Sequence, residues 1–186
     1  MNASFDRCSL YLSPEQHDFS AEDITSLLVA LQEIDFIADR IDTQKADSHY
    51  FTGKKFLDYI AYMGCAPAIQ FEADEHNDKF CFIKIHQLEK PILIHSQVQA
   101  KAPHCPGCNK PVKNWQQSKT ETQIFCERCN TSFNIAEFNW RKMAGVARLF
   151  IEITDVFPKE VIPQQLLLDK LANITDVKWL YFYSCR

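Results

Sequence analysis

Two Cys-x-x-Cys motifs constrain the fold of this 186-residue chain more than any other feature. Cys105-Pro-Gly-Cys108 and Cys126-Glu-Arg-Cys129 are separated by 17 residues. Two cysteines three positions apart around a tight turn can direct both sulfurs to one point, and two such turns supply four tetrahedral ligands. This spacing is typical of a zinc site. The sequence therefore predicts one structural Zn²⁺ ion held by Cys105, Cys108, Cys126 and Cys129.

The residues around the cysteines fit such a site. Gly107 is expected to ease the first turn, and Asn130, which tolerates a left-handed backbone, to end the second. Four apolar side chains between the motifs are expected to pack over the metal: Val112, Trp115, Ile124 and Phe125.

The stretch from about residue 102 to residue 133 resembles a zinc ribbon, with turns that read CPGCN and CERCN. The resemblance covers these residues only. Zinc ribbons serve transcription, translation, enzymes and inert scaffolds, so it implies a local structure and a metal but no particular activity.

The same cysteine pattern is also found in sites with other functions. A rubredoxin-like iron site has similar geometry. A dithiol redox pair would not need a second matching motif. A catalytic zinc ion needs an open coordination position, which four cysteines do not leave.

Charge is unevenly distributed along the chain. Residues 1–100 carry a formal net charge of −8, residues 101–142 carry +4, and residues 143–186 are neutral. The whole chain, at −4, lacks the basic surplus of a dedicated nucleic-acid-binding protein. The cysteine-rich stretch nevertheless holds candidate contact residues for nucleic acid or a protein partner: Lys110, Lys113, Trp115, Lys119, Arg128 and Trp140.

Hydrophobic periodicity outside this stretch alternates between helix and strand patterns. Helices are predicted over about 20–38, 54–63 and 163–174. Residues 68–73 and 79–85 are predicted to form an antiparallel hairpin, and residues 177–184, apolar on both faces, an interior strand. Further strands are predicted at 8–12, 92–100 and 147–154.

These patterns predict an α+β fold with an antiparallel or mixed sheet and packed helices. Residues 1–100 and 143–186 form one discontinuous domain in this interpretation, and residues 101–142 are an inserted zinc ribbon. Cys8, Cys65, Cys81 and Cys185 are isolated in the sequence and are interpreted as unpaired.

No secretory signal or membrane-spanning run is visible, so the chain is expected to be cytoplasmic and free of membrane contact. The favoured function is an accessory or adaptor protein that acts through protein–protein contacts with an unidentified partner. Nucleic-acid binding through the basic stretch is the alternative. No nucleotide-binding or hydrolase motif is present, so an enzyme with a site in the α+β domain is the third hypothesis and no catalytic residue is assigned.

Overall fold

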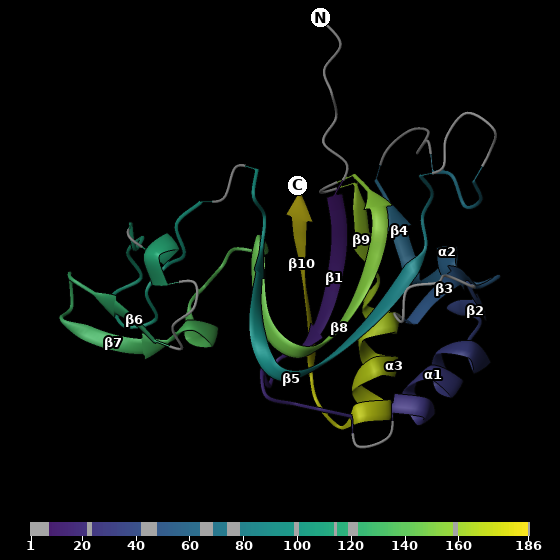
Figure 1. Cartoon of the computed structure of the whole chain (residues 1–186), viewed down its shortest axis with the longest axis horizontal. Helices are drawn as coiled ribbons and strands as arrows, with labels where there is room; N and C mark the ends of the chain where they lie inside the picture. The colour runs from purple at the N-terminus through teal and green to yellow at the C-terminus, as the bar shows by residue number, and fades with distance from the viewer. Residues whose placement is uncertain are drawn as a thin grey trace, which may run out of the picture.

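The computed structural model describes residues 8–21, 24–41, 48–63, 69–73, 79–98, 101–113, 115–118, 123–157 and 160–185. Among these residues, no helix combines the length and the apolar character that a membrane crossing requires. A large antiparallel sheet dominates the fold, and a smaller lobe that contains the four paired cysteines lies beside it (Figure 1). We call residues 101–142 the cysteine lobe.

The main sheet has six strands in the order β10-β1-β8-β5-β3-β2. Every neighbouring pair is antiparallel, which confirms the antiparallel form of the predicted sheet within a fold that has more strand than helix. The strands are β1 (Cys8–Pro14), β2 (Ile37–Arg40), β3 (Ser48–Thr52), β5 (Ile83–His95), β8 (Ala144–Val156) and β10 (Trp179–Cys185).

Two helices, α1 (Ile24–Glu33) and α3 (Gln165–Thr175), lie against one face of this sheet (Figure 1). Leu27 and Leu31 of α1, and Leu167 and Leu171 of α3, are buried in the core between helices and sheet. The alternation predicted for 147–154 is confirmed, because Leu149, Ile151 and Ile153 all face this core.

The opposite face of the sheet is apolar near its bend. β5 and β8 are long strands that curve together, with a register irregularity between Gln87 and Ile92 (Figure 1). The curve encloses a second, smaller core that contains Tyr11, Phe150 and Phe182. A bulge bends a strand because one strand contributes extra residues, so the irregularity accounts for the curve.

The predicted first helix is too long at its C-terminal end. Asp35 has a left-handed backbone (φ 56°), and the N–H of Phe36 donates to the carbonyl of Leu31. This arrangement closes a helix with a Schellman motif. Ile37 then begins β2, so the apolar residues near the predicted helix end belong to a strand.

The helix predicted over 54–63 is mostly wrong. Only α2 (Phe56–Tyr59) is helical, and β4 (Ile60–Tyr62) follows at once and pairs with β9 (Val161–Pro163). The tertiary partner overrides the helical spacing here, because a strand from far along the chain offers the backbone another set of hydrogen bonds. Pro163, expected at the start of the last helix, lies in β9 instead.

The hairpin of 68–73 and 79–85 is not formed in the described residues. Residues 69–73 are not in a strand, and β5 begins only at Ile83. The predicted interior strand at 177–184 is an edge strand, β10. It is apolar on both faces because Trp179 faces the helix-covered core and Phe182 faces the second core.

Cys8 and Cys185 form a disulfide, so the interpretation of both as unpaired is wrong. They are 177 residues apart in sequence but directly opposite in the β1–β10 register. Disulfides are rare in reducing compartments, so this pair weighs against the premise from which a cytoplasmic location is expected.

Candidate metal centre

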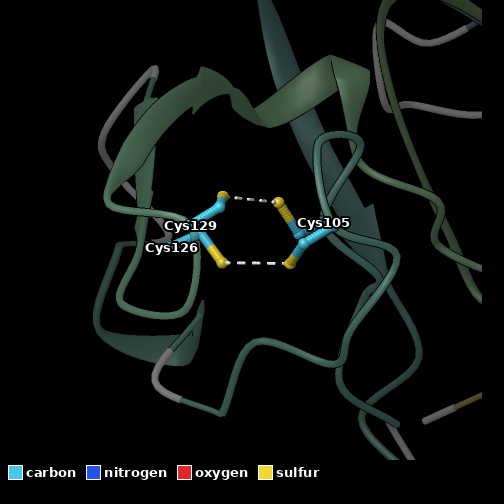
Figure 2. A group of neighbouring side chains, drawn as sticks. Cys105, Cys126 and Cys129 are labelled. Atoms are coloured by element: carbon cyan, nitrogen blue, oxygen red, sulfur yellow. Dashed lines mark hydrogen bonds between the residues drawn. The ribbon is translucent and has the colours of Figure 1, made fainter.

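Two turns of the cysteine lobe bring the four predicted ligands together. The first turn holds Cys105 and Cys108, and the second follows the end of β6 (Gln123–Cys126) and leads into β7 (Thr131–Asn134). β6 and β7 pair as a hairpin, which places the second turn at its tip. Figure 2 shows the sulfurs of the two turns facing one another across a short gap.

The sulfur positions fit a single tetrahedral ion. All four Sγ atoms lie within 4.8 Å of one another. The Cys105–Cys129 and Cys108–Cys126 sulfur pairs are each 3.7 Å apart. Sulfurs placed about 2.3 Å from a central zinc ion at tetrahedral angles are about 3.8 Å apart. The four cysteines can therefore hold a metal ion, as the sequence predicts.

The backbone at both turns supports this arrangement. Asn109 and Asn130, each directly after the second cysteine of a motif, have left-handed backbones with φ of 54° and 51°. The expectation for Asn130 is confirmed, and the same residue type at Asn109 was a signal for the first turn. The N–H of Asn109 donates to the carbonyl of Cys105 at 2.8 Å, which closes that turn.

Gly107 is needed at the first turn for a reason other than the backbone freedom expected from the sequence. Its backbone is not left-handed. A Cβ atom at this position would lie 2.7 Å from the ring of Phe133 in β7 and 3.6 Å from the Cys129 sulfur. A glycine is required because the opposite hairpin packs directly against the first turn.

The local electrostatics differ between the cysteines. The backbone N–H groups of Cys129 and Arg128 are directed at the Cys126 sulfur and lower the pKa of this thiol to about 7, although burial acts in the opposite direction. Burial, together with the thiols of Cys105 and Cys126, raises the pKa of Cys129 to about 11. Metal binding requires thiolates, so an ion at this site displaces protons.

A small hydrophobic core lies under the metal centre. Val112, Trp115 and Ile124 are buried in it, as predicted, but Phe125 is 53% exposed. Phe125 lies between two buried residues of β6, so strand alternation turns its ring outward. Leu93 of β5 and Ala144 of β8 also pack in this core, so the lobe and the main sheet share part of their apolar interior.

The candidate contact residues fall into two groups. Lys110, Lys113 and Arg128 are exposed. Trp115 and Trp140 are only 3% and 8% exposed, and their rings pack edge to face at 5.2 Å. The structure therefore contradicts a contact role for the two tryptophans. Lys119 lies outside the described residues.

A polar cluster that the sequence did not reveal lies on the curved face of the main sheet. The Glu152 carboxylate accepts a hydrogen bond from the Ser9 hydroxyl at 2.7 Å and lies 2.8 Å from His86 Nε2 and 3.6 Å from Lys84 Nζ. The contacts with His86 and Ser9 and the charge of Lys84 lower the pKa of Glu152 to about 2, although burial acts to raise it.

The geometry of this cluster indicates a structural role. The Ser9 hydroxyl donates to the carboxylate rather than to the histidine, and a carboxylate whose pKa is lowered to about 2 is too weak a base to activate it as a nucleophile. Ser9, His86 and Glu152 come from β1, β5 and β8, three adjacent strands of the sheet. Alternation alone could have placed Glu152 on the less buried face, but only the sheet order shows its partners.

Comparison with protein-family models, curated proteins and solved structures found no match to this chain.

Proposed function

We propose that the protein is an adaptor whose cysteine lobe is held in shape by one structural Zn²⁺ ion and presents a contact surface to a protein partner. One observation carries this proposal. A complete set of four metal ligands lies beside an aromatic ring that faces outward from the β6–β7 hairpin. Four thiolates complete a tetrahedral shell and leave no position for a substrate. Phe125, on β6, is 53% exposed beside that shell.

Exposed aromatic side chains are over-represented in protein interfaces, where they supply much of the binding energy. Lys113 and Arg128, in the same lobe, are exposed cations that can contribute to the polar rim of such an interface. Zinc in this proposal stabilises the lobe, and the surface residues of the lobe provide the specificity.

Zinc content and partner retention test the proposal together. The full chain, tagged and expressed in its native host, is expected to contain one zinc ion and to retain a partner protein after nuclease treatment. Phe125→Asp is expected to lose the partner at unchanged zinc content. The matched control is Leu166→Asp, which changes an equally exposed apolar residue on α3. Retention of the partner by Phe125→Asp would show that the lobe is not the contact surface.

Nucleic-acid binding remains the second candidate because Lys110, Lys113 and Arg128 are exposed on the basic lobe. The burial of Trp115 and Trp140 removes the two tryptophans from a stacking surface and leaves Phe125 for that role. This candidate predicts affinity for single-stranded nucleic acid that falls steeply with salt and is lost on charge reversal at Lys110 and Lys113. Absence of binding at low salt eliminates it.

A further inference from the structure

The free edge of β10 lines a groove of about 880 Å³ between α3 and the cysteine lobe. Among the described strands, β10 is the terminal strand of the main sheet and pairs with β1 alone. Leu168 and Ala172 of α3 line one side of the groove, and Arg141 and Lys142 at the end of the lobe line another.

The β1–β10 register shows which backbone groups face this groove. The N–H of Glu15 donates to the carbonyl of Lys178 across the strand pair, so even-numbered residues of β10 direct their backbone groups toward β1. Odd-numbered residues therefore direct theirs outward. Tyr183 follows this alternation, because its N–H points away from β1 and donates to the carbonyl of Lys142 at 3.0 Å.

Trp179 and Tyr181 are the odd-numbered residues of β10 that precede Tyr183, and their backbone groups also point away from β1. Among the described residues, no backbone–backbone hydrogen bond is formed by their outward N–H and C=O groups; Trp179 is only 2% exposed, so Tyr181 provides the more open part of this edge. Residues 179–181 read Trp-Leu-Tyr and contain no charge, proline or glycine. Natural sheet edges are usually protected by such residues, so an uncharged edge with free backbone groups is suited to pairing with another strand.

The groove has a closed end with positive charge. Lys142 occupies the Tyr183 position of the edge with its own carbonyl, so an added strand cannot continue past it. Arg141 and Lys142 are consecutive left-handed residues (φ 52° and 60°) in a turn closed by the Met143 N–H and the Trp140 carbonyl. Such a turn normally uses Asn or Gly. Here it places two exposed cationic side chains at the closed end, where Arg141 donates to the carbonyl of Ala102 and Lys142 Nζ lies 4.0 Å from the centre of the Tyr181 ring.

The position of this edge inside a groove favours a single extended segment over a second copy of this chain as the partner of β10. The edge of β10 lies in a groove with α3 on one side and the lobe on another. In a second copy the same edge is recessed in the same way, so the two edges cannot approach to the strand spacing of about 4.8 Å. A single extended segment can enter.

We propose that this groove binds the C-terminal tail of a partner protein as a strand added beside residues 179–181, with its terminal carboxylate next to Arg141 and Lys142. The tail runs parallel to β10, because its carboxyl end lies at the Tyr183 end of the edge. Main-chain hydrogen bonds supply affinity in this type of recognition, and the cations select the free carboxylate. This inference rests on the proposed protein-binding function and gives it a site apart from Phe125.

The test uses the zinc-loaded full chain and a displayed library of short random peptides with free C-termini. Enriched peptides are then synthesised as the free acid, as the C-terminal amide, and with alternate backbone amides N-methylated. The free acid is expected to bind, and the amide to bind about tenfold more weakly or worse, since a hydrogen bond to a charged group contributes about 1.5–3 kcal/mol. N-methylation is expected to abolish binding and needs no change in the protein.

Matched variants locate the bound peptide. Tyr181→Pro removes an outward N–H without removing a hydrogen bond to β1 and is expected to abolish binding. Tyr181→Phe keeps the N–H, releases Lys142 Nζ from the hydroxyl that now accepts its hydrogen bond, and is expected to bind. Lys142→Glu is expected to weaken binding of the free acid at least tenfold. Lys54→Glu, the same charge change at an exposed position outside the groove lining, is expected to leave it unchanged.

Several outcomes overturn the inference. These are enrichment of no peptide, equal binding of acid and amide, tolerance of N-methylation, and equal binding by Tyr181→Pro and Tyr181→Phe. Concentration-dependent dimerisation through β10 overturns it in favour of a second copy. If no peptide binds but the partner is still lost on Phe125→Asp, the groove assignment fails alone; if Phe125→Asp also retains the partner, the proposed lobe surface fails too.

Discussion

Among the residues that the structure describes, the core between the helices and the main sheet contains 22 buried residues, whereas the core of the cysteine lobe contains nine, among them two of the metal-site cysteines. A sheet with 22 buried side chains can be stable through burial of apolar surface. A segment of about 40 residues with so small a core usually needs a metal or disulfides. These two cores are therefore unequal in size, and the smaller one is expected to depend on a metal ion for its stability.

Loss of the metal site has the largest expected effect. Cys126→Ser is expected to abolish stoichiometric zinc binding and unfold the lobe, because structural zinc contributes on the order of 10 kcal/mol to small modules. The main sheet is expected to stay folded. The indole NMR signals report both regions, since Trp115 and Trp140 lie in the lobe core and Trp179 in the main core. Normal zinc content in this variant contradicts the four-cysteine assignment.

A substitution in the core of the main sheet tests the other region of the molecule. Phe36 is fully buried and packs against Phe56 with ring centroids 5.4 Å apart. Phe36→Ala is expected to lower the free energy of unfolding of the sheet by about 4 kcal/mol, through lost transfer energy and the cavity left behind. Urea unfolding measures the effect, and zinc content should not change. Phe125→Ala, at an exposed ring, is the control and is expected to change stability by less than about 0.5 kcal/mol.

The disulfide is expected to matter slightly less. The double variant Cys8→Ser/Cys185→Ser releases a loop of 177 residues and is expected to destabilise the main sheet by about 3 kcal/mol. The double variant is preferable to a reducing agent because it leaves the four metal-site thiols untouched. A urea midpoint equal to that of the wild type contradicts the cross-link, and a loss of zinc contradicts the independence of the two regions.

The last expected effect is a dependence of the stability of the main sheet on pH. The pKa of Glu152 is lowered from 4.5 to about 2 in the folded protein. A depressed pKa contributes stability above about pH 4.5, and this contribution disappears as pH falls toward 2. At about 1.4 kcal/mol per pKa unit, the contribution is about 3 kcal/mol.

Glu152→Gln tests this assignment. The variant cannot titrate, so its sheet stability is expected to change less than that of the wild type between pH 4.5 and 2. Both proteins are compared by urea unfolding with the Trp179 signal as the readout. Parallel pH profiles show that Glu152 is not responsible. The lobe provides a contrast, because its acid sensitivity is expected to come from protonation of the four metal-site thiolates and to be the same in both proteins.

The sequence by itself determined the features that depend on neighbours in the chain. Two Cys-x-x-Cys turns identify the candidate ligands, because four sulfurs around one ion need little more than two tight turns. Alternation identified the strand that became β8, and helical spacing identified the buried leucines of α3. These patterns are local consequences of backbone geometry.

Tertiary structure decided what depends on distant partners. The pairing of β4 with β9 replaced most of a predicted helix, and the second core made the edge strand β10 apolar on both faces. The Cys8–Cys185 disulfide and the Glu152 cluster each join residues from strands far apart in sequence. The burial of the two lobe tryptophans was decided in the same way. The physical reason is common to all of them: which groups face one another depends on sheet order and register, which no local pattern encodes.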